Sequence, residues 1–236
     1  MKQPFFAAIA LTFLLLAAGA TCKAQPADDV VWPDSLNTVK DADYLTENEK
    51  GVIYEMNKVR TNPKLYAEYV KREKTFYSKK RIEKPGETPI LTQEGIAAVD
   101  ECIKALQKAK PVGVIRPNKN LSKAAQLLAK DQAKTGKTGH IGSAGSTISD
   151  RIKRYCTEMN DNFDYGYGII FGENISYGSS KPQDVVIQLL IDDGVPSRGH
   201  RDNIMKPEFN TAGVAIDTHP KYRYLCVIDY AFLVYK

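Results

Sequence analysis

The amino-acid sequence predicts an α+β domain with a mostly antiparallel central sheet. Most segments with apolar residues at helical spacing come early in the 236-residue chain. Segments rich in β-branched and aromatic residues follow in the last third, at 167–177, 212–216 and 222–235. Because strands do not alternate with helices, the pattern argues against a doubly wound parallel sheet. The length suffices for one substantial core, so we expect one domain.

The first expected helix is defined by its cap and its spacing. Thr46 and Glu49 form a capping box, and apolar residues follow at helical spacing from Val52 onward. Pro63 disfavours a helical backbone at Asn62, so we expect the helix to break there and then to resume.

Further helices are expected after a basic surface loop over residues 71–90. Small polar residues, glycine and proline mark their ends. These residues are Thr92 as the cap of a second helix, Gly136 as the stop of a third over about 121–134, Ser143 and Ser146 as caps of a short helix within 146–155, and Pro182 at the start of another.

The N-terminus has the pattern of a secretory signal peptide over residues 1–24. An apolar run from Phe5 to Ala18 follows a lysine and precedes small residues, with cleavage expected after Ala20 or Ala24. The run is too short to span a bilayer, and no other segment is apolar enough to do so. A lipoprotein anchored at Cys22 is the less favoured alternative. We expect a flexible leader over 25–45, a domain over 46–236, and a secreted or periplasmic protein.

The charge and the cysteine content limit the classes of binding partner and the number of possible disulfide bridges. The net charge is +5 without a block of lysine and arginine, so we expect no nucleic-acid partner. We also expect a monomer. Signal cleavage would leave Cys102, Cys156 and Cys226, an odd number that permits at most one internal bridge. We expect Cys102 to be buried on a helix and, if a bridge forms, Cys156 to pair with Cys226.

Three stretches hold polar residues that packing alone does not explain. They are 138–152, 171–178 and 192–204, and each combines glycines with a histidine or an acid. Imidazole is both a common ligand of divalent metals and a general base near neutral pH. Two histidines with a carboxylate could hold zinc with an open position, or form a hydrogen-bonded network without metal. The H-E-x-x-H motif of common metalloproteases is absent.

The same stretches carry a resemblance to a known family. "GHIGSAGSTISDRI", "GENISYG" and "SRGHRDNIM", in this order, resemble the CAP superfamily of cysteine-rich secretory proteins, antigen 5 and pathogenesis-related 1 proteins, in particular its bacterial secreted branch. Asn57 and Arg60 match the Asn-x-x-Arg of the family's first helix, and we expect Arg60 to contact a carboxylate. The resemblance covers about residues 46–235 and implies a three-layer α-β-α sandwich.

The resemblance also implies a cleft formed by two histidines and two acids. His140 matches the first histidine, Glu173 the first acid and His200, in a glycine-flanked loop, the second histidine. The family's Trp-x-x-Glu helix is absent here, so Asp192 or Asp193 would have to replace the second acid. We add Asn174 and Ser143 to the expected residues of the cleft.

Members of this family act in varied ways, which leaves three hypotheses. The first is a secreted binding module whose cleft holds a divalent cation, a small molecule or a cell-envelope ligand. The second is a zinc-dependent hydrolase in which His140 and His200 hold the metal and Glu173 activates water. The third is a carrier of a lipid or another apolar ligand. We favour binding without turnover.

Overall fold

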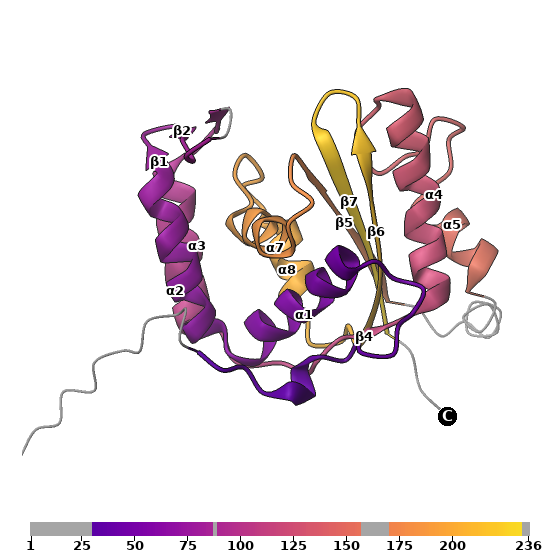
Figure 1. Ribbon diagram of the computed structural model, residues 1–236, viewed down its shortest axis with the longest axis horizontal. Helices are drawn as coiled ribbons and strands as arrows, with labels where there is room; N and C mark the ends of the chain where they lie inside the picture. Colours follow the sequence, from indigo (N-terminus) through magenta and orange to yellow (C-terminus); the bar gives the residue numbers. More distant parts are fainter. Residues whose placement is uncertain (1–29, 87–88, 157–169, 233–236) are drawn as a thin grey trace, which may run out of the picture. The chain divides into compact units, whose positions relative to one another are not determined.

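The central sheet of the protein has four strands in the order β4-β6-β7-β5. The computed structural model describes residues 30–86, 89–156 and 170–232, and the described residues from Val31 onward form one compact unit (Figure 1). β7 pairs antiparallel with both β5 and β6, and the short β4 runs parallel to β6. The prediction of a mostly antiparallel sheet is therefore confirmed. The strands are β4 Arg116–Pro117, β5 Phe171–Tyr177, β6 Thr211–His219 and β7 Arg223–Ala231.

Helices cover both faces of this sheet and make the predicted α-β-α sandwich. Figure 1 shows α4 and α5 on one side of the strands and α1, α7 and α8 on the other. Leu128 of α4 packs with Leu225 and Val227, whereas the Tyr230 hydroxyl reaches the Met56 sulfur of α1 at 3.2 Å. These contacts follow from the alternation of side chains along β7. The helices are α1 Glu47–Thr61, α4 Lys119–Thr135, α5 Ile148–Tyr155, α7 Pro182–Ile191 and α8 Gly199–Met205.

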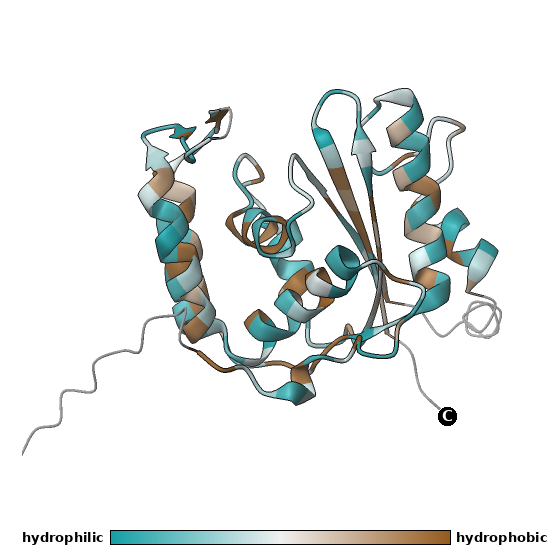
Figure 2. Cartoon of the chain, in the orientation of Figure 1, coloured by the Kyte–Doolittle hydropathy of each residue, from teal (hydrophilic) through white to brown (hydrophobic). Residues whose placement is uncertain are grey.

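Two more helices and a small second sheet lie beside α7. α2 (Pro63–Glu73) and α3 (Ile96–Lys108) pack against each other, and α3 also contacts α7. The predicted loop over 71–90 instead holds the end of α2, a short 3₁₀ helix and strands of two residues. These elements are η3 Lys74–Phe76, β1 Tyr77–Ser78, β2 Arg81–Ile82 and β3 Ile90–Leu91, and a further 3₁₀ helix, η2 Asp34–Leu36, precedes α1. Hydrophobic residues run along the central strands and along one side of the helices (Figure 2).

Several helix ends are where the sequence predicts them. The Thr46–Glu49 capping box is present, Gly136 ends α4 in the left-handed region, and Pro182 is the first residue of α7. The cap predicted at Thr92 is wrong. α3 begins four residues later, after Gly95, and the Thr92 hydroxyl is buried without a hydrogen-bond partner in the described part of the chain.

The predicted flexible leader over 25–45 is also wrong for its second half. Leu36, Val39, Ala42 and Leu45 are all buried. The Asn57 amide nitrogen of α1 donates to the Leu36 carbonyl at 2.9 Å, which ties the segment to the first helix. Residues 34–45 are therefore part of the folded domain. The predicted signal peptide lies outside the described residues.

The expected bridge between Cys156 and Cys226 is wrong, because Cys226 is a buried free thiol. Cys156 clusters with Leu121 and Ala231 under α4. Cys226 alternates with Leu225 and Val227, which face α4, so its thiol points to the opposite side of the sheet. Cys102 is buried in α3, as expected. In the described part of the chain, none of the helices has the length and apolar character needed to cross a bilayer.

Candidate functional site

The candidate site is the histidine pair, His140 and His200. The two ring centroids lie 6.5 Å apart and the ring planes are inclined by 29°. His140 follows α4 on one side of the sheet, and His200 belongs to α8 on the other. They meet because both contact residues of β5, which is an edge strand of the sheet. His200 does not lie in a loop as predicted, because it is the second residue of α8.

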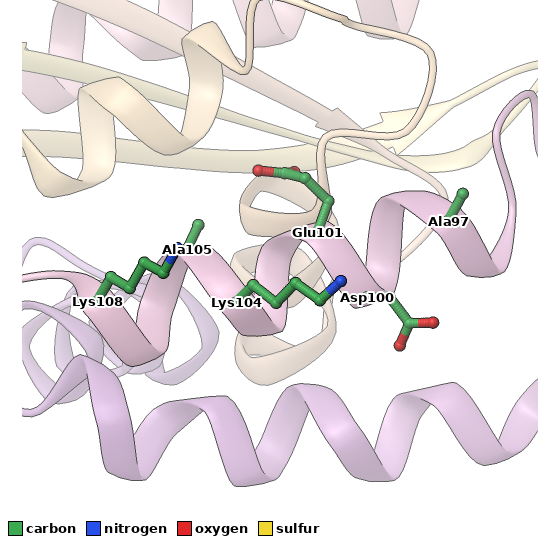
Figure 3. Close-up of a pocket in the computed structure, with 6 residues that line it drawn as sticks. All are labelled: Ala97, Asp100, Glu101, Lys104, Ala105 and Lys108. Atoms are coloured by element: carbon green, nitrogen blue, oxygen red, sulfur yellow. The ribbon is translucent and has the colours of Figure 1, made fainter.

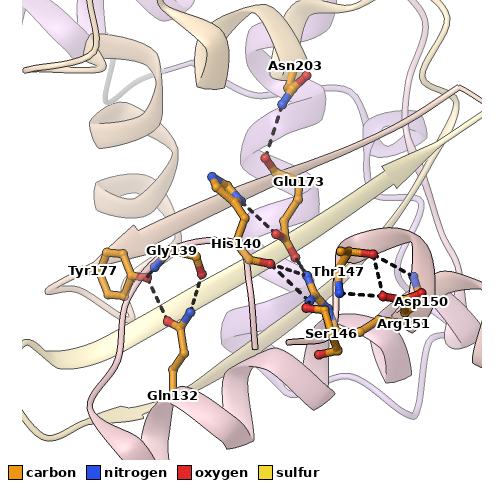
Figure 4. Close-up of polar contacts among 10 residues, drawn as sticks. All are labelled: Gln132, Gly139, His140, Ser146, Thr147, Asp150, Arg151, Glu173, Tyr177 and Asn203. Atoms are coloured by element: carbon orange, nitrogen blue, oxygen red, sulfur yellow. Dashed lines mark hydrogen bonds and ion pairs between the residues drawn. The ribbon is translucent and has the colours of Figure 1, made fainter. Parts of the chain in front are cut away.

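The backbone around His140 is held by two residues that sequence analysis missed. The Tyr177 hydroxyl accepts a hydrogen bond from the Gly139 amide at 2.9 Å and donates to Gln132 Oε1 at 2.8 Å. Gln132 Nε2 in turn donates to the Gly139 carbonyl at 2.6 Å, as Figure 4 shows. The signal for Gln132 is a polar residue on the buried face of α4, where it is fully shielded from solvent.

Glu173 of β5 anchors the His140 ring. His140 Nδ1 lies 2.8 Å from Glu173 Oε1, and Arg151 Nη2 of α5 lies 2.6 Å from Glu173 Oε2 (Figure 4). The side chains of Glu173 and Arg151 are 2% and 1% exposed, so this ion pair is shielded from water. Arg151 also donates to the carbonyls of His140 and Ser146. Sequence analysis missed Arg151, whose signal is its place next to Ile152 on the inner side of a short amphipathic helix.

Asp192 anchors the second histidine in a matching way. His200 Nδ1 lies 2.5 Å from Asp192 Oδ1, and the His200 amide donates to Asp192 Oδ2 at 3.0 Å. Asp192 ends α7 in the left-handed region, with φ of 56°, which turns its carboxylate toward α8. The His200 carbonyl accepts from Asn174 Nδ2 at 2.9 Å. Asn203, which the sequence did not single out, donates to Asn174 Oδ1 at the same distance.

Two residues expected in the cleft lie elsewhere. The Asp193 carboxylate accepts hydrogen bonds from the amides of residues 93, 94 and 95, so it holds the segment that leads into α3. The Ser143 amide and hydroxyl both contact the Asp131 carboxylate. The predicted capping of α5 by Ser143 and Ser146 is wrong, because Thr147 is the N-cap and forms a capping box with Asp150.

Arg60 fixes the far end of α8. Its guanidinium donates to the carbonyls of Ile204, Lys206 and Phe209 at 2.7–2.9 Å, and to that of Gly113 at 2.7 Å. The expected carboxylate partner is therefore wrong, since all four acceptors are backbone oxygens. Burial lowers the pKa of Arg60 to about 10.

The free nitrogen of each ring is its Nε2. A carboxylate only accepts hydrogen bonds, so Nδ1 of both histidines carries a hydrogen and a neutral ring has its lone pair on Nε2. Neither Nε2 hydrogen-bonds a residue within the described ranges. The His140 side chain is 52% exposed and that of His200 is 22% exposed, so both are accessible from solvent. The pair can offer two nitrogen ligands to a cation, or two donors to an anion when protonated.

The donor set fits a divalent metal only in part. Structural and catalytic zinc sites use three or four protein ligands, whereas the described residues contain no cluster of three or more His, Cys, Asp and Glu suited to a metal. The oxygens of Glu173 and Asp192 already accept from other groups. Tetrahedral zinc with bonds of about 2.1 Å would bring the two centroids to about 5 Å, so the rings would also have to approach.

A separate groove of about 480 Å³ runs along α3 (Figure 3). Its acid Glu101 contacts Arg198 at 3.1 Å and Arg201 at 2.6 Å. The groove is lined by Ala97, Asp100, Glu101, Lys104, Ala105 and Lys108, and none of these residues belongs to the histidine pair.

The sandwich is the fold that the resemblance implies, and the two histidine rings lie near each other at its edge strand β5. Residues 53–233 match the cysteine-rich secretory protein family, and the chain belongs to this CAP family.

Two solved structures are similar to the chain, and no curated protein matches it. The first is an extracellular protein with an SCP domain from Bacillus anthracis str. Ames, at 19% identity and a TM-score of 0.39 over 52% of this chain. The second is an outer surface protein from Borrelia burgdorferi, at 15% identity and a TM-score of 0.40 over 52% of this chain and 80% of that one. The chain spans 35% of the length of the Bacillus protein.

Proposed function

We propose that this CAP-domain protein is a binding module, and that the histidine pair holds a divalent cation together with a ligand that completes its coordination. The carrying observation is that a buried carboxylate fixes Nδ1 of each ring, at 2.8 Å for His140 and 2.5 Å for His200. Such carboxylates set the tautomer, orient the ring and make its other nitrogen a better ligand. The site then offers two oriented nitrogens on a solvent-exposed surface.

An incomplete donor set favours binding of a ligand together with the ion. Two protein nitrogens leave at least two positions of a tetrahedral zinc open. Water, or a carboxylate or phosphate of a small molecule, would occupy them. The affinity for the bare ion should consequently be weak, and it should fall at acidic pH because protons compete for the same nitrogens.

The contacts of Glu173 argue against the zinc hydrolase hypothesis. A general base needs a free oxygen within reach of the attacking water. Glu173 Oε1 is engaged by His140 and Oε2 by Arg151, and its side chain is 2% exposed. We therefore assign Glu173 to positioning the ring. The hypothesis of an apolar carrier has no support of comparable specificity in the described contacts.

We also propose that the protein acts outside the cytoplasm. The support is the signal-like run over residues 1–24 together with the secretory description of the family. N-terminal mass analysis of protein recovered from the cell envelope and from the medium tests this. Protein that remains in the cytoplasm and retains residues 1–24 would contradict the proposed location.

The cation site is tested by calorimetric titration of the purified protein with Zn²⁺ and Co²⁺. We expect one bound ion, and a double variant His140→Ala, His200→Ala that has lost it. Asp192→Asn should weaken binding about 10- to 100-fold, since it removes the carboxylate charge that supports the Nδ1 hydrogen of His200. Ser143→Ala is the matched control, because its hydroxyl contacts Asp131 and not the rings. Equal affinity in the wild type and the double variant would refute the proposal.

A further inference from the structure

A second buried acid, Asp229 of β7, lies next to Glu173, the residue that holds the His140 ring. In the antiparallel register Asp229 is paired with Glu173 on β5. Their neighbours Val227 and Ile175 both pack under α4, so the alternation of the strands places both acids on that face. Directly opposed residues of antiparallel strands have Cβ atoms about 5 Å apart, within reach of two carboxyl groups. Asp229 is fully buried.

The two carboxyl groups cannot both be ionised without an uncompensated charge in the core. Both Asp229 oxygens are buried and accept no hydrogen bond from a described residue. The groups around them are Glu173 on β5, Gly213 on β6, Arg151 on α5 and the small or apolar residues of α4. Arg151 supplies one positive charge, and its Nη2 is already paired with Glu173. An isolated buried carboxylate is so costly that it takes up a proton instead.

We propose that Asp229 is a neutral carboxylic acid in the folded protein and that its hydrogen is donated to Glu173, which makes Asp229 a positioning residue for His140. The proton comes from solvent as the chain folds, and no other group is chemically changed. Glu173 remains ionised and accepts from three donors: His140, Arg151 and Asp229. Arg151 and Asp229 then hold the Glu173 carboxylate in the core, and Glu173 in turn holds the His140 ring.

The electrostatic environment supports this assignment. Burial and the neighbouring Glu173 raise the pKa of Asp229 well above its ordinary value, and Arg151 opposes this only in part. A carboxylic acid is also the one state of Asp229 that can form a hydrogen bond with an ionised Glu173. The inference deepens the proposed function, because it concerns the residue that orients His140, but its tests need no bound ion.

The first test compares the wild type with Asp229→Asn, whose amide can donate to Glu173 without a charge. With a raised pKa in the folded state, stability is full below the unfolded pKa of about 4 and falls as pH rises above it. The unfolding equilibrium constant of the wild type, relative to that of Asp229→Asn, should therefore rise about tenfold per pH unit above pH 4. Exposed Asp43, changed to Asn, is the control and should show no such slope. A ratio that is constant from pH 4 to 8 would overturn the proposal.

The second test reads the proton and the positioning directly. The ¹³C chemical shift of the Asp229 carboxyl should be that of a protonated acid at pH 7, and an ionised value there would overturn the proposal. In ¹⁵N spectra of the His140 ring, Asp229→Asn should resemble the wild type and Asp229→Leu should differ. Ring signals unchanged in Asp229→Leu would refute the positioning role. If the wild type does not bind Zn²⁺, only the proposed function fails. The proposal for Asp229 fails only on the outcomes of its own two tests, so the two failures are distinguishable.

Discussion

Replacing Arg60 by methionine tests how α8 and its histidine are held. Arg60 is fully buried and donates to four backbone carbonyls, three of them at the end of α8 or just beyond it. The lowering of its pKa from 12.5 to about 10 corresponds to a cost of about 3 kcal/mol for burying the charge. Four hydrogen bonds from a charged donor, at about 1.5–3 kcal/mol each, exceed that cost.

Methionine fills a similar volume but leaves the four carbonyls without a donor. At about 1 kcal/mol or more for each unsatisfied acceptor, the free energy of unfolding should fall by about 4 kcal/mol. Arg60→Lys keeps the charge but cannot reach all four oxygens, and we expect a loss of about half as much. Since natural domains are stable by only about 5–15 kcal/mol, Arg60→Met should be close to unfolding.

Urea unfolding followed by circular dichroism at neutral pH measures these differences. Arg154→Met, on the exposed side of α5, is the matched control and should change stability by no more than about 0.5 kcal/mol. A loss below about 1 kcal/mol in Arg60→Met would refute the reasoning, because it would mean that the four carbonyls find other donors at little cost.

Three further predictions concern packing, ion pairing and thiols. Gly213→Ala should cost about 3 kcal/mol or more in urea unfolding, since a Cβ would lie 2.0 Å from the Ser122 amide nitrogen, whereas Gly113→Ala has open space and should change stability by less than about 1 kcal/mol. NMR titration should show that Arg198 lowers the pKa of Glu94 to about 2, and Arg198→Gln should raise that pKa toward 4.5. Because the pKa is lowered in the folded state, the ion pair stabilises the fold at neutral pH, and this stabilisation is lost as the pH falls toward 2. An unchanged Glu94 pKa in that variant would contradict the assignment. Burial raises the pKa of Cys102 to about 12 and also raises that of Cys226, so iodoacetamide at pH 8 should label neither thiol until urea is added; rapid labelling of the native protein would refute this.

Local signals in the sequence predicted the helices and the class of fold. Thr46 with Glu49, Gly136 and Pro182 each act within one turn of the chain, so their roles follow from residue type and spacing. Thr92 failed as a cap because a remote group, the Asp193 carboxylate, takes up the amides at the start of that segment. A cap supplied from about 100 residues away leaves no local pattern.

The order of the motifs along the sequence predicted only some of the residues of the site. The sequence nominated His140, Glu173 and His200, and it left Asp192 and Asp193 as equal candidates for the second acid. The left-handed backbone at the end of α7 separates them, because it turns Asp192 to His200 and leaves Asp193 for α3. Arg151 and Asp229 act through the register of distant segments, which a single sequence does not show.

The position of the two imidazoles on opposite layers of the sandwich has a mechanical consequence. His140 is attached through Glu173 and Arg151 to the α4–α5 layer, and His200 through Asp192 to the α7–α8 layer. A ligand that binds both rings therefore links the two layers across the edge of the sheet. The free energy of ligand binding then opposes separation of the two layers, so the melting temperature of the protein should rise with ligand concentration.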